Sequence, residues 1–246
     1  MLLLLPPSET KREGGADASS LDLAALSFAQ LTPARKLTLA ALTSLSRNLG
    51  ASTGALGLGP TQRFEIARNR AIRVSPTMAA IDRYTGVVYD GIDALSLGRD
   101  ARAFATEHLA IHSALFGLLK ADDPIPAYRL SHNSRLPGLS LRTVWREPIS
   151  RVLSDHPGLI VDLRSESYVA LGPAPKHSVY VRVVSETAGG RRVALSHFNK
   201  KSKGEFVRSV LLAGIDHDSV DSLIAWATAS GIRLSKGPEG ELELVV

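Results

Sequence analysis

A run of lysines lies between a strand-like segment and a helix-like segment late in the chain. Lys200, Lys201 and Lys203 follow alternating apolar residues and precede apolar residues at helical spacing. Ser202 and Glu205 have the spacing of a capping box, which predicts that the helix begins immediately after the lysines. Free backbone N–H groups at a helix N-terminus favour anions. The segment therefore predicts a phosphate-like anion site, and lysines that simply extend into solvent are the alternative.

Polar side chains also follow the first strand-like segment, where Ser8 and Lys11 lie in one loop. A lysine that is partly desolvated among other cations can have its pKa lowered and act as a nucleophile. Lys201 is our first candidate for such a nucleophile and Lys11 the second. Ser8, Tyr128 and Tyr168 are candidates for proton transfer to or from that lysine.

Arginines are dense between residues 128 and 151, where Arg129 and Arg135 accompany three others, opposed only by Glu147. The planar guanidinium group binds phosphates and carboxylates through two parallel hydrogen bonds, so this density suits anion recognition. Internal pairing of the arginines explains the density equally well, with Asp122, Asp123 and Asp155 as the partners.

A helix, a glycine-bounded turn and a second helix are predicted over about residues 76–119. The turn runs from Gly86 to Gly91 and contains Tyr89, and Asp100 caps a long helix that continues to the end of this range. This outline is typical of a helix-hairpin-helix element, which binds one DNA strand through backbone N–H groups of its turn. A plain structural turn is the alternative, because the glycines are unusually far apart.

Metal and thiol chemistry have little support. Glu107, His108 and His112 put two histidines four residues apart, which can chelate a metal on a helix, but no third ligand is near in sequence. The absence of cysteine excludes disulfides, thiolate metal sites and thiol peroxidase chemistry. We therefore expect no metal and no cofactor, and a reducing, cytoplasmic location. The apolar start at residues 1–5 is too short for a signal peptide, and no apolar run approaches the roughly 20 residues that span a bilayer.

Composition and patterning predict one domain of the α+β class over residues 1–246. The chain is 44% hydrophobic, and its net charge of +5 favours polyanionic partners. Helical patterns dominate about residues 21–120, whereas strand patterns dominate the second half and residues 1–5 join them in a mixed sheet. In the second half, a buried strand over 159–163 precedes Ser165, which can cap a short helix. Further segments predict two hairpins, one over 179–198 with its turn at Gly189-Gly190 and one over 232–246.

Several of these segments together resemble the YaaA family of bacterial peroxide-stress proteins. The matching features occur in the family's order over nearly the whole chain: the Pro-Ser-x-x-Lys loop after the first strand, Tyr89-Asp90-Gly91-Ile92, Glu107-His108-Leu109, Tyr128-Arg129-Leu130, the Trp145 region, Val161-Asp162-Leu163 with Ser165 and Tyr168, and Lys200-Lys201-x-Lys203-Gly204. This chain departs from the family pattern at Asp162 and Lys203, where relatives carry Asn and Arg.

The resemblance implies a cytoplasmic protein that protects against hydrogen peroxide and iron-driven oxidative DNA damage. It also implies binding of duplex DNA or a nucleotide-like anion in a basic cleft, with a helix-hairpin-helix element. The residues expected in that site are Lys200, Lys201, Lys203, Arg129, Arg135, Ser165, Gly86, Tyr89 and Gly91. The alternative is a lysine-dependent enzyme that acts on a nucleobase, nucleotide or damaged DNA base, with Lys201, Lys11, Ser8 and Tyr128 as catalytic candidates.

Overall fold

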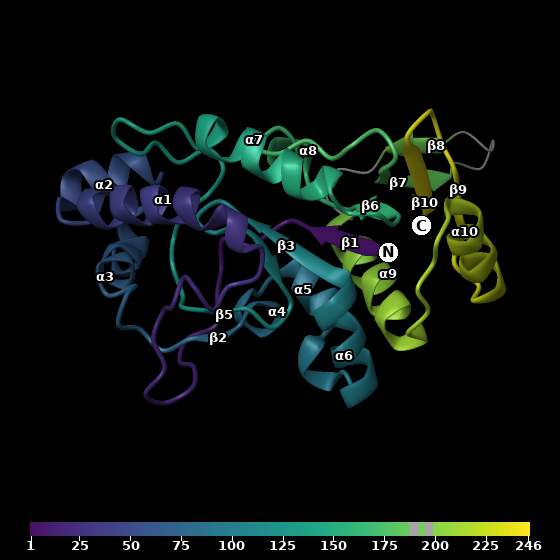
Figure 1. The fold of residues 1–246 in the computed structure, drawn as a ribbon, viewed down its shortest axis with the longest axis horizontal. Helices are drawn as coiled ribbons and strands as arrows, with labels where there is room; N and C mark the ends of the chain where they lie inside the picture. Colours follow the sequence, from purple (N-terminus) through teal and green to yellow (C-terminus); the bar gives the residue numbers. More distant parts are fainter. Residues whose placement is uncertain (187–191, 195–198) are drawn as a thin grey trace.

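The structure is a computed structural model that describes residues 1–186, 192–194 and 199–246 (Figure 1). It is a single domain of mixed helices and strands, which confirms the predicted α+β class. Helices outnumber strands in the first hundred residues, and the later part of the chain supplies most of the strands. None of the helices in these ranges is long and apolar enough to cross a membrane.

The α-helices of the described residues, in chain order, are α1 (Thr32–Leu45), α2 (Leu49–Ala55), α3 (Phe64–Arg70), α4 (Ala80–Arg83), α5 (Val87–Ile92), α6 (Arg99–His108), α7 (Leu141–Ser154), α8 (Glu166–Val169), α9 (Asn199–Ala213) and α10 (Val220–Ala229). The strands are β1 (Leu2–Leu5), β2 (Met78–Ala79), β3 (Leu109–Ser113), β4 (Gly117–Lys120), β5 (Pro124–Ile125), β6 (Ile160–Asp162), β7 (Val179–Glu186), β8 (Arg192–Ala194), β9 (Leu234–Lys236) and β10 (Glu241–Val245).

The main sheet has a parallel centre with antiparallel strands at its edges. Its order is β4-β3-β1-β6-β7-β10-β9, and β8 pairs with β7 beyond the end of β6. The first strand is central, because β1 pairs in parallel with β3 on one side and with β6 on the other, so that Leu4 lies opposite both Ala110 and Asp162. Its residues Leu2 to Leu5 are all buried, as expected for a strand covered on both faces.

The carboxyl ends of β1, β3 and β6 lie at one edge of the sheet, because these strands are parallel. The chain leaves β1 to form β3 on one side of it, and later leaves β6 toward β7 on the other side. Ligands of open parallel sheets bind at such a reversal, beside the carboxyl ends of the strands. The loops after β1 and β6 are therefore the first place to look for a functional site.

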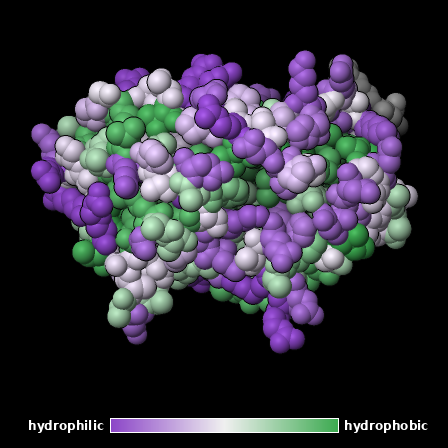
Figure 2. All heavy atoms as spheres, in the orientation of Figure 1, coloured by the Kyte–Doolittle hydropathy of each residue, from purple (hydrophilic) through white to green (hydrophobic). Residues whose placement is uncertain are grey.

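Helices cover the two faces of this sheet. In Figure 1, α7 and α8 lie above β1 and β6, and α5, α6 and α9 lie below them. The lower helices pack closely on one another as well as on the sheet, through contacts of α9 with α5, α6 and β7. Hydrophilic side chains cover most of the face shown in Figure 2, with smaller apolar areas between them.

The prediction of a long helix from Asp100 through residue 119 is wrong for its second half. Helix α6 ends at His108, and residues 109–120 form the antiparallel strands β3 and β4. Every residue of β3 is buried, so the segment has no polar face and its apolar run fits a buried strand as well as a helix. Gly117, with a φ of 68°, allows the tight turn that begins β4.

The predicted turn from Gly86 to Gly91 is also wrong, because residues 87–92 form helix α5. Val88 and Ile92 lie four residues apart and are both buried, so this segment has the apolar spacing of a helix. Gly86 precedes the helix with a φ of 96°, and Gly91 lies against the backbone of α9. No exposed hairpin is formed between Gly86 and Gly91.

Several other predicted elements are confirmed, with shifts at their ends. These are the helix that begins at Thr32-Pro33, the strand at 160–162, the short helix after Ser165 and the closing hairpin of β9 and β10. Helix α9 includes the lysines, because it begins at Asn199 rather than after them. The Gly189-Gly190 turn and residues 195–198 lie outside the described residues.

Candidate functional site

Lys11 lies buried in the loop that follows β1. Its amine donates hydrogen bonds to the backbone carbonyls of Ser8, at 3.0 Å, and Glu9, at 3.3 Å. It also lies 4.1 Å from the centroid of the Tyr128 ring and 5.2 Å from that of Tyr84. Burial lowers the pKa of Lys11 to about 7; Glu65 opposes this shift and Arg129 adds to it. A substantial fraction of the amine is therefore uncharged at neutral pH.

A chain of hydroxyl groups lies beneath this lysine. The Tyr128 hydroxyl is 2.7 Å from the Tyr84 hydroxyl and 2.6 Å from that of Ser113, the last residue of β3. The Ser113 hydroxyl in turn accepts hydrogen bonds from the backbone N–H groups of Leu115 and Phe116. Burial raises the pKa of both tyrosines, so both stay protonated at neutral pH.

Arg129 lies next to Lys11 and is also buried, with 7% of its surface exposed. Its Nη2 atom donates to the Glu9 carboxylate at 2.6 Å, and its backbone is held on both sides by the Asn69 side chain. The expected partners Asp122, Asp123 and Asp155 are not used by Arg129. Glu9 therefore contacts both cations, Lys11 through its carbonyl and Arg129 through its carboxylate.

Lys203 occupies a similar setting at the end of β6. Its amine donates to the carbonyl of Leu163 at 3.0 Å and lies 4.9 Å from the centroid of the Tyr180 ring. Burial lowers its pKa to about 8, although Asp162 opposes the shift. The predicted anion-binding lysine is thus buried in α9 and joined to the sheet.

Asp162 and Arg164 form a buried ion pair at the same edge. The guanidinium group uses Nε and Nη2 to contact both carboxylate oxygens, at 2.9 and 2.7 Å. Its Nη1 atom lies 2.9 Å from His112 Nδ1. Because arginine only donates, Nδ1 of His112 accepts and the proton lies on Nε2. Burial, reinforced by the Arg164 charge, holds the pKa of His112 well below its ordinary value, so this histidine is neutral.

The other predicted cations are exposed. Lys201 lies 3.4 Å from Glu205 and has 65% of its side chain exposed, and Lys200 and Arg135 are exposed as well. Ser165 is exposed at the N-terminal end of α8 and makes no side-chain capping bond. These residues do not join the group around Lys11.

The residues of the predicted DNA-gripping turn are used inside the molecule. Tyr89 is buried, and its hydroxyl donates to the carbonyl of Pro6 at 2.8 Å. A side chain at Gly86 would meet the hydroxyls of Ser8 and Thr10, and one at Gly91 would meet the α9 backbone. The structure gives these three residues a packing role around the β1 loop.

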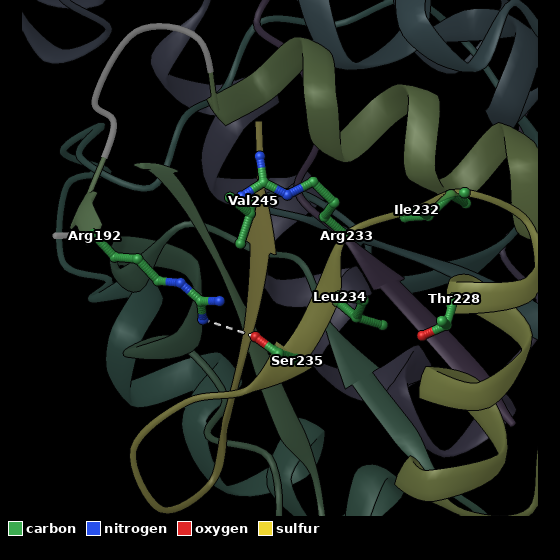
Figure 3. Close-up of a pocket in the computed structure, with 8 residues that line it drawn as sticks. Arg192, Thr228, Ile232, Arg233, Leu234, Ser235 and Val245 are labelled. Atoms are coloured by element: carbon green, nitrogen blue, oxygen red, sulfur yellow. Dashed lines mark hydrogen bonds between the residues drawn. The ribbon is translucent and has the colours of Figure 1, made fainter. Parts of the chain in front are cut away.

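A separate cavity lies between α10 and the strands β9 and β10. It has a volume of about 310 Å³ and includes Arg192, whose Nη1 atom donates to Ser235 at 2.8 Å (Figure 3). Both arginines that line it already pair with glutamates, Arg192 with Glu243 and Arg233 with Glu186. It contains none of the predicted site residues.

Of the predicted residues, the structure places Ser8, Lys11, Tyr128 and Arg129 together. Sequence reasoning missed several of their neighbours. Glu9, Glu65, Tyr84 and Ser113 come from segments far apart in the chain. Within the described ranges, no group of three or more His, Asp or Glu side chains is placed to hold a metal ion. One signal was available, because all five tyrosines of this aromatic-poor chain lie near this edge of the sheet.

Comparison with known proteins places this site in a family context. The family described as peroxide stress protein YaaA matches residues 1–235. The chain belongs to this family. A UPF0246 protein of Corynebacterium glutamicum is 42% identical over 253 residues, covering all of both chains. A UPF0246 protein of Streptomyces coelicolor is 38% identical over 222 residues, covering 87% of this chain and 84% of the relative. Membership of the YaaA family confirms the resemblance in the sequence.

Proposed function

We propose that this YaaA-family chain acts in peroxide stress as a lysine-dependent enzyme, with Lys11 as the nucleophile toward a nucleobase-like or nucleotide-like substrate. The observation that supports this most is the buried Lys11 amine, which lies over Tyr128 with its pKa lowered to about 7. Among the described residues, no carboxylate lies within ion-pair distance of this amine. This environment is typical of lysines that form Schiff bases.

The chemistry follows from the hydrogen bonds of the amine. In the neutral form, its two N–H groups can serve the carbonyls of Ser8 and Glu9, which leaves the nitrogen lone pair free for attack. Addition to a carbonyl carbon followed by loss of water gives an imine between Lys11 and the substrate. The departing oxygen takes its protons from solvent, because the raised pKa of Tyr128 makes its buried hydroxyl a weak acid.

Reductive trapping tests this proposal. The chain is incubated with borohydride and either a duplex that contains an abasic site or the small aldehyde pyridoxal, and the modified lysine is found by peptide mapping. We expect an adduct at Lys11 in the natural protein and in Lys201→Met, and its loss in Lys11→Met. An absence of adduct with both aldehydes, or an adduct that survives Lys11→Met, would refute the proposal.

Duplex DNA binding is a second candidate function, supported by exposed arginines around α7. Arg135, Arg142 and Arg146 are exposed, and none has a carboxylate partner among the residues that the structure describes. Such cations would bind phosphates without regard to sequence, and affinity would fall steeply with salt. The triple replacement by glutamine should weaken binding at low salt and reduce the salt dependence. Affinity that is equal at low and physiological salt would exclude this function.

A further inference from the structure

Arg129 lies beside Lys11 with its backbone fixed by Asn69 and its side chain buried. The Asn69 side chain accepts from the Arg129 backbone N–H at 2.8 Å and donates to its carbonyl at 2.9 Å. The side chain is 8% exposed, and Arg129 is close enough to help lower the pKa of Lys11. A buried cation in a fixed position suits the recognition of a specific anionic group.

Of the two parallel donors Nε and Nη2 of this guanidinium group, only Nη2 has a hydrogen-bond partner in the part of the chain that the structure describes. Its Nη2 atom donates to the Glu9 carboxylate, whereas its Nε atom is buried and has no hydrogen-bond partner among the described residues. Arginine binds carboxylates and phosphates most strongly through two parallel N–H donors. A buried donor without an acceptor is unfavourable, and a ligand oxygen would offset this cost.

The present partner of Arg129 can be displaced. Glu9 lies in the loop after β1, and 55% of its side chain is exposed, so its carboxylate can turn into solvent at little cost. The carbonyl of the same residue accepts from Lys11 at 3.3 Å. Glu9 thus contacts Arg129 through its carboxylate and Lys11 through its carbonyl. An anion that replaces the carboxylate would therefore lie close to the Lys11 amine.

We propose that Arg129 binds the oxyanion of the substrate, a phosphate or a carboxylate, through Nε and Nη2, and that Glu9 occupies this position until the substrate displaces it. The substrate class is thus an anionic carbonyl compound whose electrophilic carbon lies a few bonds from its charged group. This proposal rests on the proposed function of Lys11. It adds that Glu9 lowers the affinity for the substrate's anion by competing for the same arginine.

Two pairs of aldehydes test anion recognition, each with and without the charged group. Pyridoxal 5′-phosphate is compared with pyridoxal, and 4-carboxybenzaldehyde with benzaldehyde. In each reaction the Lys11 nitrogen bonds to the aldehyde carbon, loses its two protons and releases the aldehyde oxygen as water. Borohydride then delivers hydride to the imine carbon, a solvent proton goes to nitrogen, and the resulting amine is quantified at Lys11 by mass spectrometry.

We expect at least one anionic aldehyde to label Lys11 about 10 to 100 times faster than its neutral counterpart, the range expected for a charge-assisted hydrogen bond. Arg129→Gln should abolish this preference and Arg129→Lys should reduce it, because lysine lacks the fork. Glu9→Gln should increase the ratio of the anionic to the neutral rate several-fold; both rates should also rise together, because the Glu9 charge helps to raise the Lys11 pKa. The pair that shows the preference identifies the anion as phosphate or carboxylate.

The outcomes distinguish failure of anion binding by Arg129 from failure of Lys11 as the nucleophile. Labelling of Lys11 by both members of each pair at equal rates, or a preference that survives Arg129→Gln, would overturn the role of Arg129 alone. If no aldehyde labels Lys11, the nucleophile proposal fails. Calorimetric binding of pyridoxal 5′-phosphate then decides on Arg129, which is supported by an affinity lost in Arg129→Gln and raised in Glu9→Gln, and refuted by equal affinities.

Discussion

The hydroxyl of Ser113 lies 2.6 Å from the hydroxyl of Tyr128 and connects the end of β3 to the ring that lies against Lys11. Ser113 itself is fixed by two backbone N–H groups that donate to its oxygen. Tyr128 in turn reaches the Tyr84 hydroxyl, so the central sheet and two loops share one chain of hydrogen bonds. The position of the tyrosine ring beneath the lysine is therefore set by the sheet.

Tyr128→Phe should destabilise the protein by about 1 to 3 kcal/mol. The substitution keeps the ring against Lys11 but removes the hydroxyl, which leaves two buried hydroxyl partners without their shared neighbour. Chemical denaturation measures this change. Tyr180→Phe is the control, because Tyr180 is only half-buried, and its effect should be smaller. Equal losses in the two variants would contradict a special role for the Tyr128 hydroxyl.

The reactivity of Lys11 should depend on pH around neutrality. Because burial lowers its pKa to about 7, the fraction of uncharged amine and the rate of aldehyde labelling should reach half their maximum near that pH. Labelling of Lys201, whose side chain is 65% exposed, serves as the internal control. Labelling of Lys11 that follows the same profile as Lys201 would contradict the buried, uncharged amine.

The same lowered pKa predicts a pH-dependent stability. The unfolded chain binds the Lys11 proton more tightly than the folded one, so the folded state should gain stability as pH rises from about 7 to 10.5. Lys11→Met removes this titration, so the natural protein should gain stability relative to the variant over this range. The gain can reach roughly 5 kcal/mol at most. Denaturation of both proteins at pH 7 and pH 9 measures it, and a constant difference would contradict the prediction.

The residue types of the site were predictable from the sequence. Which of the candidate lysines is buried and reactive was not. Lys11 and Arg129 were both chosen for their chemistry, and the structure brings them together through Glu9. The sequence favours Lys201 over Lys11 because cations are dense around it, yet Lys201 is exposed and paired with Glu205. Burial decides which lysine loses its charge, and burial is set by segments distant in sequence.

The fold, too, was predictable only where local periodicity decides the structure. The class and most element positions follow from local periodicity, as at α1 and the closing hairpin. The sequence favours a helix over residues 109–119, because a mostly apolar segment has no clear period that distinguishes a buried strand from a helix. Only the pairing of β3 with the central β1 settles that choice, and it joins residues more than a hundred positions apart.

Asp162→Asn should be strongly destabilising, by about 3 to 5 kcal/mol. Asp162 and Arg164 are both buried and joined by two hydrogen bonds, so removal of the carboxylate charge leaves a buried guanidinium group unbalanced. Thermal or chemical denaturation measures the loss. Glu205→Gln breaks the exposed pair with Lys201 and should cost about 1 kcal/mol or less. Similar losses in the two variants would show that the buried pair contributes no more than a surface pair.

Gly204→Ala should disrupt the crossing of α5 and α9, which supports the loop of Lys11 through Tyr89. A Cβ atom at Gly204 would overlap the carbonyl oxygen of Val88, so the two helices would have to separate. Overpacking of this kind costs about 1 to 3 kcal/mol, or more where backbone must move. Tyr89 would then lose its 2.8 Å contact with the Pro6 carbonyl, so aldehyde labelling at Lys11 should also change.

The matched control for this crossing is Gly54→Ala in α2. Gly54 has open space where its Cβ would lie and a helical backbone, so alanine should stabilise the protein by about 0.5 to 1 kcal/mol. Denaturation midpoints of the two variants should therefore move in opposite directions. If Gly204→Ala were neutral or stabilising, the close approach of α5 and α9 would not be needed to hold Tyr89 against the β1 loop, and the position of Lys11 would depend on the sheet alone.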